Sequence, residues 1–328
     1  MPRTFAIPIP RRTAILASAF FCIGGPVWAA GADYPNRAIT LIHGYGAGGS
    51  SDIGCRLLAE ALRDVTHQSV IVEPRPGAGG QIAWSRFKNS AKPDGYELVY
   101  VNVPQIQSIV FDPARKADFS IKDFKLIANH VQDPNILVVA KNSPYKTIEE
   151  FLAAAKANPG KLSITTSGLG SDDHLAILDL QLKAGASFTI IHTKGDADGM
   201  NGILGGHMDA MMANVGGMVQ PAEAGQTRIL AVMAESRVSE LPDVPTFKEK
   251  GLPLFASSTR GIALPANTPP AVAAYMEQAL RKAMASPQHL QAMKKAGFSV
   301  KFMGAAEYGT FVEAQNTWVK EMMKQYTK

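Results

Sequence analysis

Two short glycine-rich stretches of the chain carry the residue types best suited to binding an anion. The first contains Gly48, Gly49 and Ser50, and the second contains Gly170 and Ser171. Each stretch follows a predicted strand and opens a predicted helix, so it presents free backbone N–H groups and the positive end of a helix dipole. The serine hydroxyls add donors without adding charge. Two such loops predict a cleft that grips a carboxylate or a phosphate from both sides.

Two other interpretations of these loops stay open. In the first, they are plain strand-to-helix turns in which Ser50 and Ser171 act as N-caps. In the second, residues 44–49 form a G-x-G-x-x-G dinucleotide motif, and Glu73 ends the next predicted strand where a ribose-binding acid belongs. That pattern keeps an exported NAD-dependent oxidoreductase with a Rossmann domain as an alternative. The export signal described below and the absence of a convincing catalytic pair argue against it.

Acidic residues and histidines also gather in the second half of the chain. The set comprises Asp172, Asp173, His174, His192, His207 and Asp209. Carboxylate and imidazole groups together suit several metals, but the spacing here matches no recognised metal motif. We therefore expect capping acids and surface or hinge histidines, with no metal, no cofactor and no catalysis.

The N-terminal segment has the order of features of a secretory signal peptide. Arg11 and Arg12 precede an apolar run over residues 14–28, which is too short to cross a bilayer as a helix. Small residues follow, and they predict cleavage after Ala29 or Ala32, so residues 1–29 are assigned to the signal. Export to the periplasm as a soluble protein is the expectation.

Composition and charge narrow the remaining classes. The chain has 328 residues, 46% hydrophobic and 19% charged, which indicates a globular protein of two domains. The formal charge is +5, and three of those charges, Arg3, Arg11 and Arg12, lie in the signal, which leaves 5 − 3 = +2. The other basic residues are scattered among acids, so no nucleic-acid partner is expected.

The elements that position the loops follow an alternating pattern of strands and helices. Strands are predicted over residues 38–43, 69–73, 96–101, 136–140, 162–165, 188–192, 208–212, 229–234 and 258–264. Helices are predicted over residues 52–66 and 81–89, from near residues 147, 172, 196 and 215, and over most of the chain from residue 270. This alternation predicts an α/β protein with largely parallel sheets.

Several motifs, taken in order, carry a resemblance that covers nearly the whole mature chain. They lie at residues 34–41, 48–52, 72–80, 92–96, 168–176, 204–209 and 241–246. Together these stretches resemble the Bug/TctC family of extracytoplasmic solute receptors of tripartite tricarboxylate transporters.

The resemblance implies a two-domain periplasmic binding protein fold of type II-like form. Domain 1 would comprise residues 33–135 plus 256–328, and domain 2 residues 136–255, joined by two crossing strands with a ligand cleft between them. The implied function is capture of a small carboxylate and its delivery to membrane permease subunits, by a monomer. A ligand-presenting sensor for a signalling receptor is an alternative that shares the same binding chemistry.

By the same resemblance, four loops line the cleft, and they add ten candidate ligand-binding residues to the five named above. These are Tyr45, Asp52, Gly77, Ala78, Gly80, Ser167, His174, Lys194, Asp196 and Ala197. The sequence departs from the family pattern at Asp196 and Asp198, and it carries Asp172 and Asp173 beside the second loop. Acids facing the cleft would repel a multiply charged ligand, so we expect a monocarboxylate rather than a tricarboxylate, with an amino acid or an aromatic acid as candidates because of Tyr45.

Overall fold

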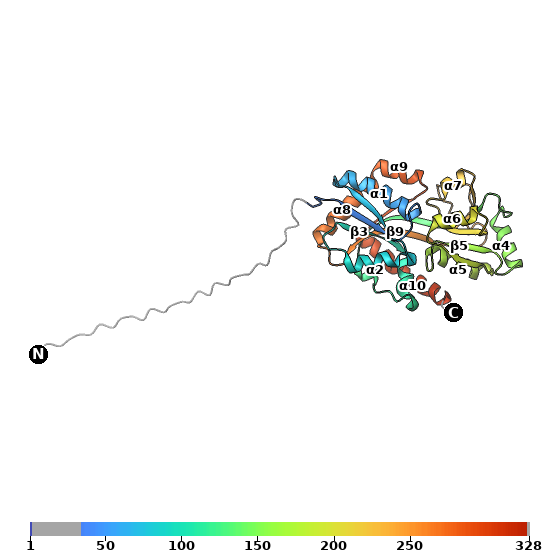
Figure 1. Ribbon diagram of the computed structural model, residues 1–328, viewed down its shortest axis with the longest axis horizontal. Coiled ribbons are helices and arrows are strands. Elements are labelled where there is room, and N and C mark those ends of the chain that lie inside the picture. Colours follow the sequence, from blue (N-terminus) through green and yellow to red (C-terminus); the bar gives the residue numbers. More distant parts are fainter. Residues whose placement is uncertain (2–33, 327–328) are drawn as a thin grey trace.

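The computed structural model describes residue 1 and residues 34–326. The predicted signal peptide and both of its cleavage positions lie, apart from Met1, outside the described residues. Within residues 34–326 the chain forms two lobes, which lie side by side in Figure 1. Across that same stretch, no helix combines the length and the apolar character needed to cross a bilayer.

The first lobe is built on one mixed sheet with helices on both faces. In spatial order its strands are β2 (Val70–Pro74), β1 (Ile39–His43), β3 (Glu97–Val103), β9 (Ser257–Pro265), the first part of β4 (Phe124–Ala140) and β10 (Val300–Gly304). One face is covered by α1 (Ser50–Thr66), α8 (Pro270–Ala285) and α9 (Pro287–Lys295). The other face carries α2 (Gln81–Ser90), α3 (Gln105–Phe111) and α10 (Ala305–Tyr326).

The second lobe repeats the same three-layer plan around a smaller sheet. Its strands are β8 (Thr227–Val232), the last part of β4, β7 (Ala210–Asn214), β5 (Ser163–Thr166) and β6 (Thr189–His192). Helices α4 (Ile148–Ala157) and α5 (Asp172–Ala184) pack on one face, while α6 (Asp196–Leu204) and α7 (Val219–Glu223) pack on the other. Short 3-10 turns lie at η1 (Ala78–Gly80), η2 (Pro113–Arg115) and η3 (Ile121–Asp123).

The periodicity of the apolar residues explains these layers. In β3, Leu98 and Tyr100 pack in the core under α1 and α8, whereas Val99 and Val101 pack in the core under α2 and α3. Successive side chains of a strand point to opposite faces, so an uninterrupted apolar strand serves both cores. The sheet therefore separates two apolar layers and is buried on both sides.

Two neighbouring segments carry the chain between the lobes. Strand β4 pairs with β9 as far as Pro134, opposite Ser257, and from Asn135 onward it pairs with strands of the second lobe. The chain returns at Ala256, whose carbonyl accepts a hydrogen bond of 2.9 Å from the N–H of Asn135. The two crossings thus lie beside each other, and both pass from the first lobe to the second at the same place.

Several sequence predictions require correction. The sheets are mixed rather than largely parallel, because β4 and β9 run antiparallel to all of their partners. Strand β4 begins at Phe124, twelve residues before the predicted start at Ile136 (136 − 124 = 12). Helix α3 and strand β10 were not predicted, and the helix expected from Val215 begins at Val219. The predicted strand and helix boundaries around both glycine-rich loops are confirmed within two residues.

Candidate ligand-binding site

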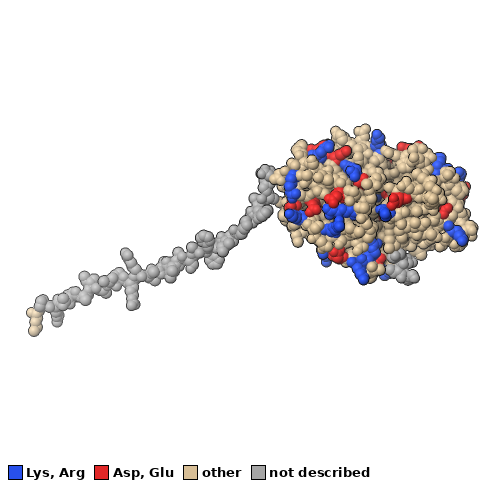
Figure 2. All heavy atoms as spheres, viewed as in Figure 1, with Lys and Arg blue, Asp and Glu red and all other residues tan. Residues whose placement is uncertain are grey.

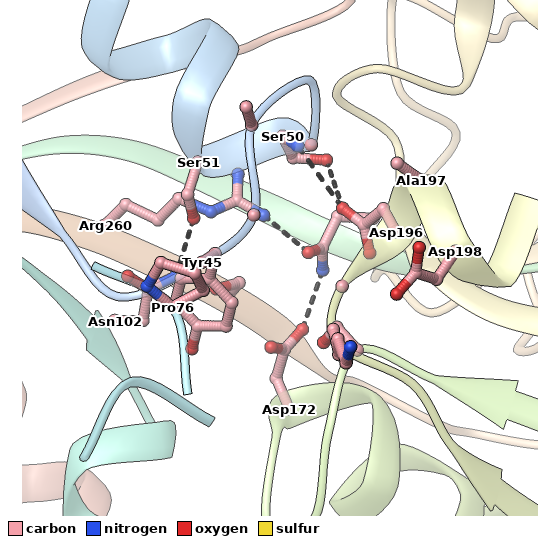
Figure 3. Close-up of a pocket in the computed structure, with 18 residues that line it drawn as sticks. Tyr45, Ser50, Ser51, Pro76, Asn102, Asp172, Asp196, Ala197, Asp198 and Arg260 are labelled. Atoms are coloured by element: carbon pink, nitrogen blue, oxygen red, sulfur yellow. Dashed lines mark hydrogen bonds between the residues drawn. The ribbon is translucent and has the colours of Figure 1, made fainter. Parts of the chain in front are cut away.

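A cavity of about 290 Å³ lies between the two lobes, next to the crossing strands. The close-up in Figure 3 shows its walls. The residues that line it are Tyr45, Gly46, Ala47, Gly49, Ser50, Ser51, Pro76, Asn102, Ser167, Asp172, Lys194, Gly195, Asp196, Ala197, Asp198, Asn214, Ser258 and Arg260. Both lobes contribute residues to these walls.

The N-terminus of α1 faces a carboxylate that the protein itself supplies. The Ser50 hydroxyl lies 2.6 Å from Oδ2 of Asp196 and 2.7 Å from the carbonyl oxygen of Gly216. A hydroxyl has one proton, so it donates to one of these acceptors at a time. The N–H of Ser50 also points at Asp196, at 3.4 Å. Because Asp196 opens α6 in the second lobe, this contact joins the lobes across the cavity (Figure 3).

A second carboxylate on the same side of the cavity is held by two amides. Oδ2 of Asp172 accepts hydrogen bonds from Asn135 at 2.8 Å and from Asn214 at 2.7 Å. Burial raises the pKa of Asp172, and these amide bonds oppose the rise. Directly behind it, burial and the charges of Asp172 and Asp196 raise the pKa of Asp173 well above its usual range. The structure therefore gathers carboxyl groups at the N-termini of α5 and α6, and burial opposes ionisation of Asp172 and Asp173.

A buried ion pair forms the floor of the cavity at the crossing strands. Nη1 of Arg260, on β9, donates to Asp133 of β4 at 2.6 Å, and Nη2 donates to Asn214 at 2.5 Å. Burial raises the pKa of Asp133 to about 6, while Arg260 and the N–H of Gly216 oppose that rise. Removing either partner would leave an unpaired charge buried in the protein, which is strongly destabilising. Arg260 also binds Asn214, so the pair holds that side chain in place at the cavity floor.

Seven of the fifteen candidate residues line this cavity. They are Tyr45, Gly49, Ser50, Ser167, Lys194, Asp196 and Ala197. Tyr45 comes from the first lobe and packs at the wall opposite Asp198 (Figure 3). Burial, followed by the charge of Asp172, raises the pKa of Tyr45 well above 10, so its phenol stays protonated.

The other eight candidates lie around the cavity rather than on its surface. Gly77 and Ala78 line a neighbouring cavity of about 600 Å³, and Gly48 lines a third one of about 240 Å³. Gly80 packs against the ring of Trp84, and Asp52 accepts hydrogen bonds from the N–H of Gly48 and from Arg56 and contacts His43. Ser171 caps α5 through the N–H of His174, and Nδ1 of His174 accepts from the N–H of Gly170. The capping interpretation is thus confirmed for Ser171, whereas Ser50 makes no cap hydrogen bond.

The sequence analysis did not nominate several residues that the structure brings to the cavity. Asn102 and Asn214 lie in largely apolar stretches of β3 and β7, whereas Arg260 and Ser258 belong to the polar first half of β9 and share one face of it. For the two asparagines, a polar residue in an apolar stretch was the available signal, since such groups are buried only with partners. Their convergence depends on strand register across the two sheets, which local sequence does not specify.

The dinucleotide alternative is not supported by this geometry. Glu73 binds Arg75, with Nε to Oε1 at 2.7 Å, and does not line the cavity. The N-terminus of α1, where a pyrophosphate would lie, already faces the carboxylate of Asp196. Among the described residues, no three of His, Cys, Asp and Glu come together in a way that suits a metal ion.

A two-lobed α/β molecule with two adjacent crossing strands and a polar cavity between its lobes is a solute-binding protein. The chain belongs to the tripartite tricarboxylate transporter receptor family, whose TctC profile matches residues 55–327. It is 35% identical, over 87% of its length and 86% of the relative's, to a UPF0065 protein from the gbd 5' region of Cupriavidus necator.

Solved structures of similar proteins agree with this family assignment. The structure of the periplasmic binding protein BugD matches with a TM-score of 0.82 at 27% identity, covering 89% of this chain and 98% of that one. The R. palustris protein Rpa4515, solved with adipate, matches with a TM-score of 0.85 at 25% identity over the same shares of the two chains. Neither the oxidoreductase nor the sensor alternative is supported by these likenesses.

Proposed function

We propose that this protein captures a small carboxylate in the cavity between its lobes and delivers it to the membrane permease subunits of a tripartite tricarboxylate-type transporter. The observation that carries the proposal is the cavity itself, lined by both lobes and flanked by the N-termini of α1 and α6. Adipate in the related R. palustris structure supports a carboxylate as the ligand class. The receptor needs no catalytic group for this task.

Contacts between the lobes support closure of the receptor around its ligand. The Ser108 hydroxyl donates to the carbonyl oxygen of Gly170 at 2.5 Å, and the amide of Gln105 donates to Leu169 at 3.2 Å. Together with the Ser50–Asp196 contact, these bonds hold the rims of the cavity together. Hinge motion at the two crossing segments would open it, with residues 33–135 plus 256–328 and residues 136–255 moving as two bodies.

Export to the periplasm belongs to the same proposal. The signal-like segment at residues 1–29 and the family's role as transporter receptors both support it. We expect the exported protein to begin at Ala30 or Asp33 and to leave the cell with the periplasmic fraction. Intact-mass measurement of that fraction tests this, and a full-length mass would contradict it.

A thermal-shift panel of small carboxylates, followed by calorimetric titration, tests binding. A ligand at about 100 times its Kd adds roughly 2.7 kcal/mol, which raises Tm by several degrees. Ala197 lines the cavity, so Ala197→Phe should abolish the shift, whereas Ala271→Phe on the exposed side of α8 should retain it. Failure of every carboxylate to bind, or equal binding by both variants, would refute the proposal.

A further inference from the structure

The cavity is electrically polarised. Asp172, Asp196 and Asp198 line it from the second lobe, at the N-termini of α5 and α6 (Figure 3). Two cationic residues, Lys194 and Arg260, line it as well. Arg260 is paired with Asp133, whereas Lys194 forms no ion pair within residues 34–326. Three carboxylates therefore face one unpaired cation.

Acceptors on this wall remain available to a ligand. In the described part of the chain, no hydrogen bond or ion pair reaches the carboxylate of Asp198, and none reaches Oδ1 of Asp196. Asp198 is an exposed residue, so its charge is solvated when the cavity is empty. A donor group in the cavity would have carboxylate oxygens to bind.

Three residues of the opposite wall each hold a buried polar atom that has no partner within residues 34–326. The hydroxyl of Ser258 and Nε of Arg260 have no hydrogen-bond partner, although these residues are only 1% and 2% exposed. Oδ1 of Asn102, which is 4% exposed, is also without a partner. Buried polar atoms without partners are rare in folded proteins, and all three residues line this cavity. The wall opposite the three acids is therefore polar and, apart from the paired Arg260, carries no charge.

Asp196 limits where a ligand carboxylate can bind. Its carboxylate sits where a ligand carboxylate would otherwise meet the N–H and hydroxyl of Ser50 at the positive end of α1. One of the two anion-binding loops is thus satisfied from within the protein. A second ligand carboxylate would find that helix end occupied and would meet like charges nearby.

We propose that the ligand carries one carboxylate and one cationic nitrogen, as an amino acid or a betaine does. Its carboxylate binds on the β9 side, near Ser258 and Arg260, and its cation binds on the side of Asp172, Asp196 and Asp198. This inference rests on the proposed receptor function and specifies the ligand class. The cavity volume of about 290 Å³ suits a molecule of amino-acid size.

Calorimetric titration with matched ligand series tests the inference. One series contains α-amino acids and unbranched ω-amino acids of two to six carbons, and the second contains dicarboxylates of equal chain length. A third series contains the corresponding simple monocarboxylates, and glycine betaine represents quaternary nitrogen. We expect an amino acid or the betaine to bind most tightly, and the comparison of these two shows whether N–H donors are required.

A variant with a matched control assigns the effect to the acidic wall. Asp198→Asn removes one charge from a side chain that makes no hydrogen bond, so the fold should persist. It should weaken binding of the best amino acid or betaine by roughly tenfold or more and strengthen dicarboxylate binding. Asp243→Asn, an exposed acid outside the cavity, should change neither.

The outcomes separate this inference from the receptor function. A dicarboxylate or a simple monocarboxylate as the tightest ligand would overturn the inference and leave the receptor proposal intact. Unchanged amino-acid affinity in Asp198→Asn would likewise overturn it. Absence of binding in all series would refute the receptor proposal itself.

Discussion

Asp196 places its carboxylate across the gap between the lobes, 2.6 Å from the hydroxyl of Ser50. A helix N-terminus attracts negative charge, and here the positive end of α1 is satisfied by a residue of the protein. The same side chain therefore contributes to lobe contact and to the charge of the cavity. Of the three acids that line the cavity, Asp196 thus has a partner in the other lobe.

The buried His174 should make the stability of the protein depend on pH. Burial, and then the neighbouring His192, lower the pKa of His174 to about 3, against an ordinary value of 6.5. Between those values the unfolded chain binds a proton that the folded protein excludes, so the free energy of unfolding falls as pH drops below 6.5. At pH 5 the loss from this one residue should be about 2 kcal/mol relative to pH 7.

Urea unfolding at pH 7 and pH 5 checks this expectation. His174→Gln keeps an oxygen that can accept from the N–H of Gly170 and removes the titrating group. The variant should lose about 2 kcal/mol less than the wild-type protein over this interval. His67→Gln, at an exposed position, should behave as the wild type does. Equal pH slopes for His174→Gln and the wild type would contradict the account.

At the scale of elements, local sequence predicts the two strand-loop-helix units well. Glycine and serine between an apolar strand and an amphipathic run marked the starts of α1 and α5, and Asp172 and Asp173 do lie in the first turn of α5. Periodicity and turn residues act over short distances, so these features are visible in one stretch of chain.

Strand pairing between distant parts of the chain could not be predicted from local sequence patterns. A proline usually ends a strand, because it has no N–H to donate to a neighbouring strand. Strand β4 nevertheless continues through Pro134, which lies where β4 stops pairing with β9 and starts pairing with β7. Its antiparallel pairing with β9 joins residues about 120 positions apart, such as Pro134 and Ser257. The floor of the cavity, formed by Asp133, Asn214 and Arg260, depends on that register.

In the glycine-rich turn after β1, the main chain at Gly44 lies close to the main chain at Gly80. A Cβ added at Gly44 would lie 2.5 Å from the Cα of Gly80, whereas a Cβ at Gly46 would meet nothing within 4 Å. Gly44→Ala should therefore lower the free energy of unfolding by about 1–3 kcal/mol, since main-chain atoms must shift. Gly46→Ala should change it by less than about 0.5 kcal/mol. Denaturant unfolding of both variants measures the contrast, and equal stabilities would show that the close approach is unimportant.

At the scale of the whole molecule, the two lobes are joined by the chain itself at the neighbouring crossings near Asn135 and Ala256. Helix α10 adds a packing contact, because its Val319, Met322 and Met323 lie against Leu175 of α5. The basic and acidic side chains visible in Figure 2 are interspersed over both lobes. On this face the charges of opposite sign therefore form no large patch of one sign.

Such an arrangement makes ligand binding and lobe closure one process. A ligand in the cavity contacts both lobes at once, so it favours the closed form by its differential affinity for that form. The proposed hinge lies at the crossing strands, and contacts between the lobes such as Ser108 with Gly170 would stabilise the closed form. A permease that binds the closed form more tightly than the open one would thereby select receptors that carry a ligand.

A crystal structure of the protein with its tightest-binding small carboxylate tests the central claim most directly. We expect one ligand molecule between the lobes, within hydrogen-bond distance of residues from both, including Ser258 of the first lobe and Asp198 of the second. Tyr45 should contact the ligand from the opposite wall. A ligand bound elsewhere, with this cavity filled only by water, would contradict the account.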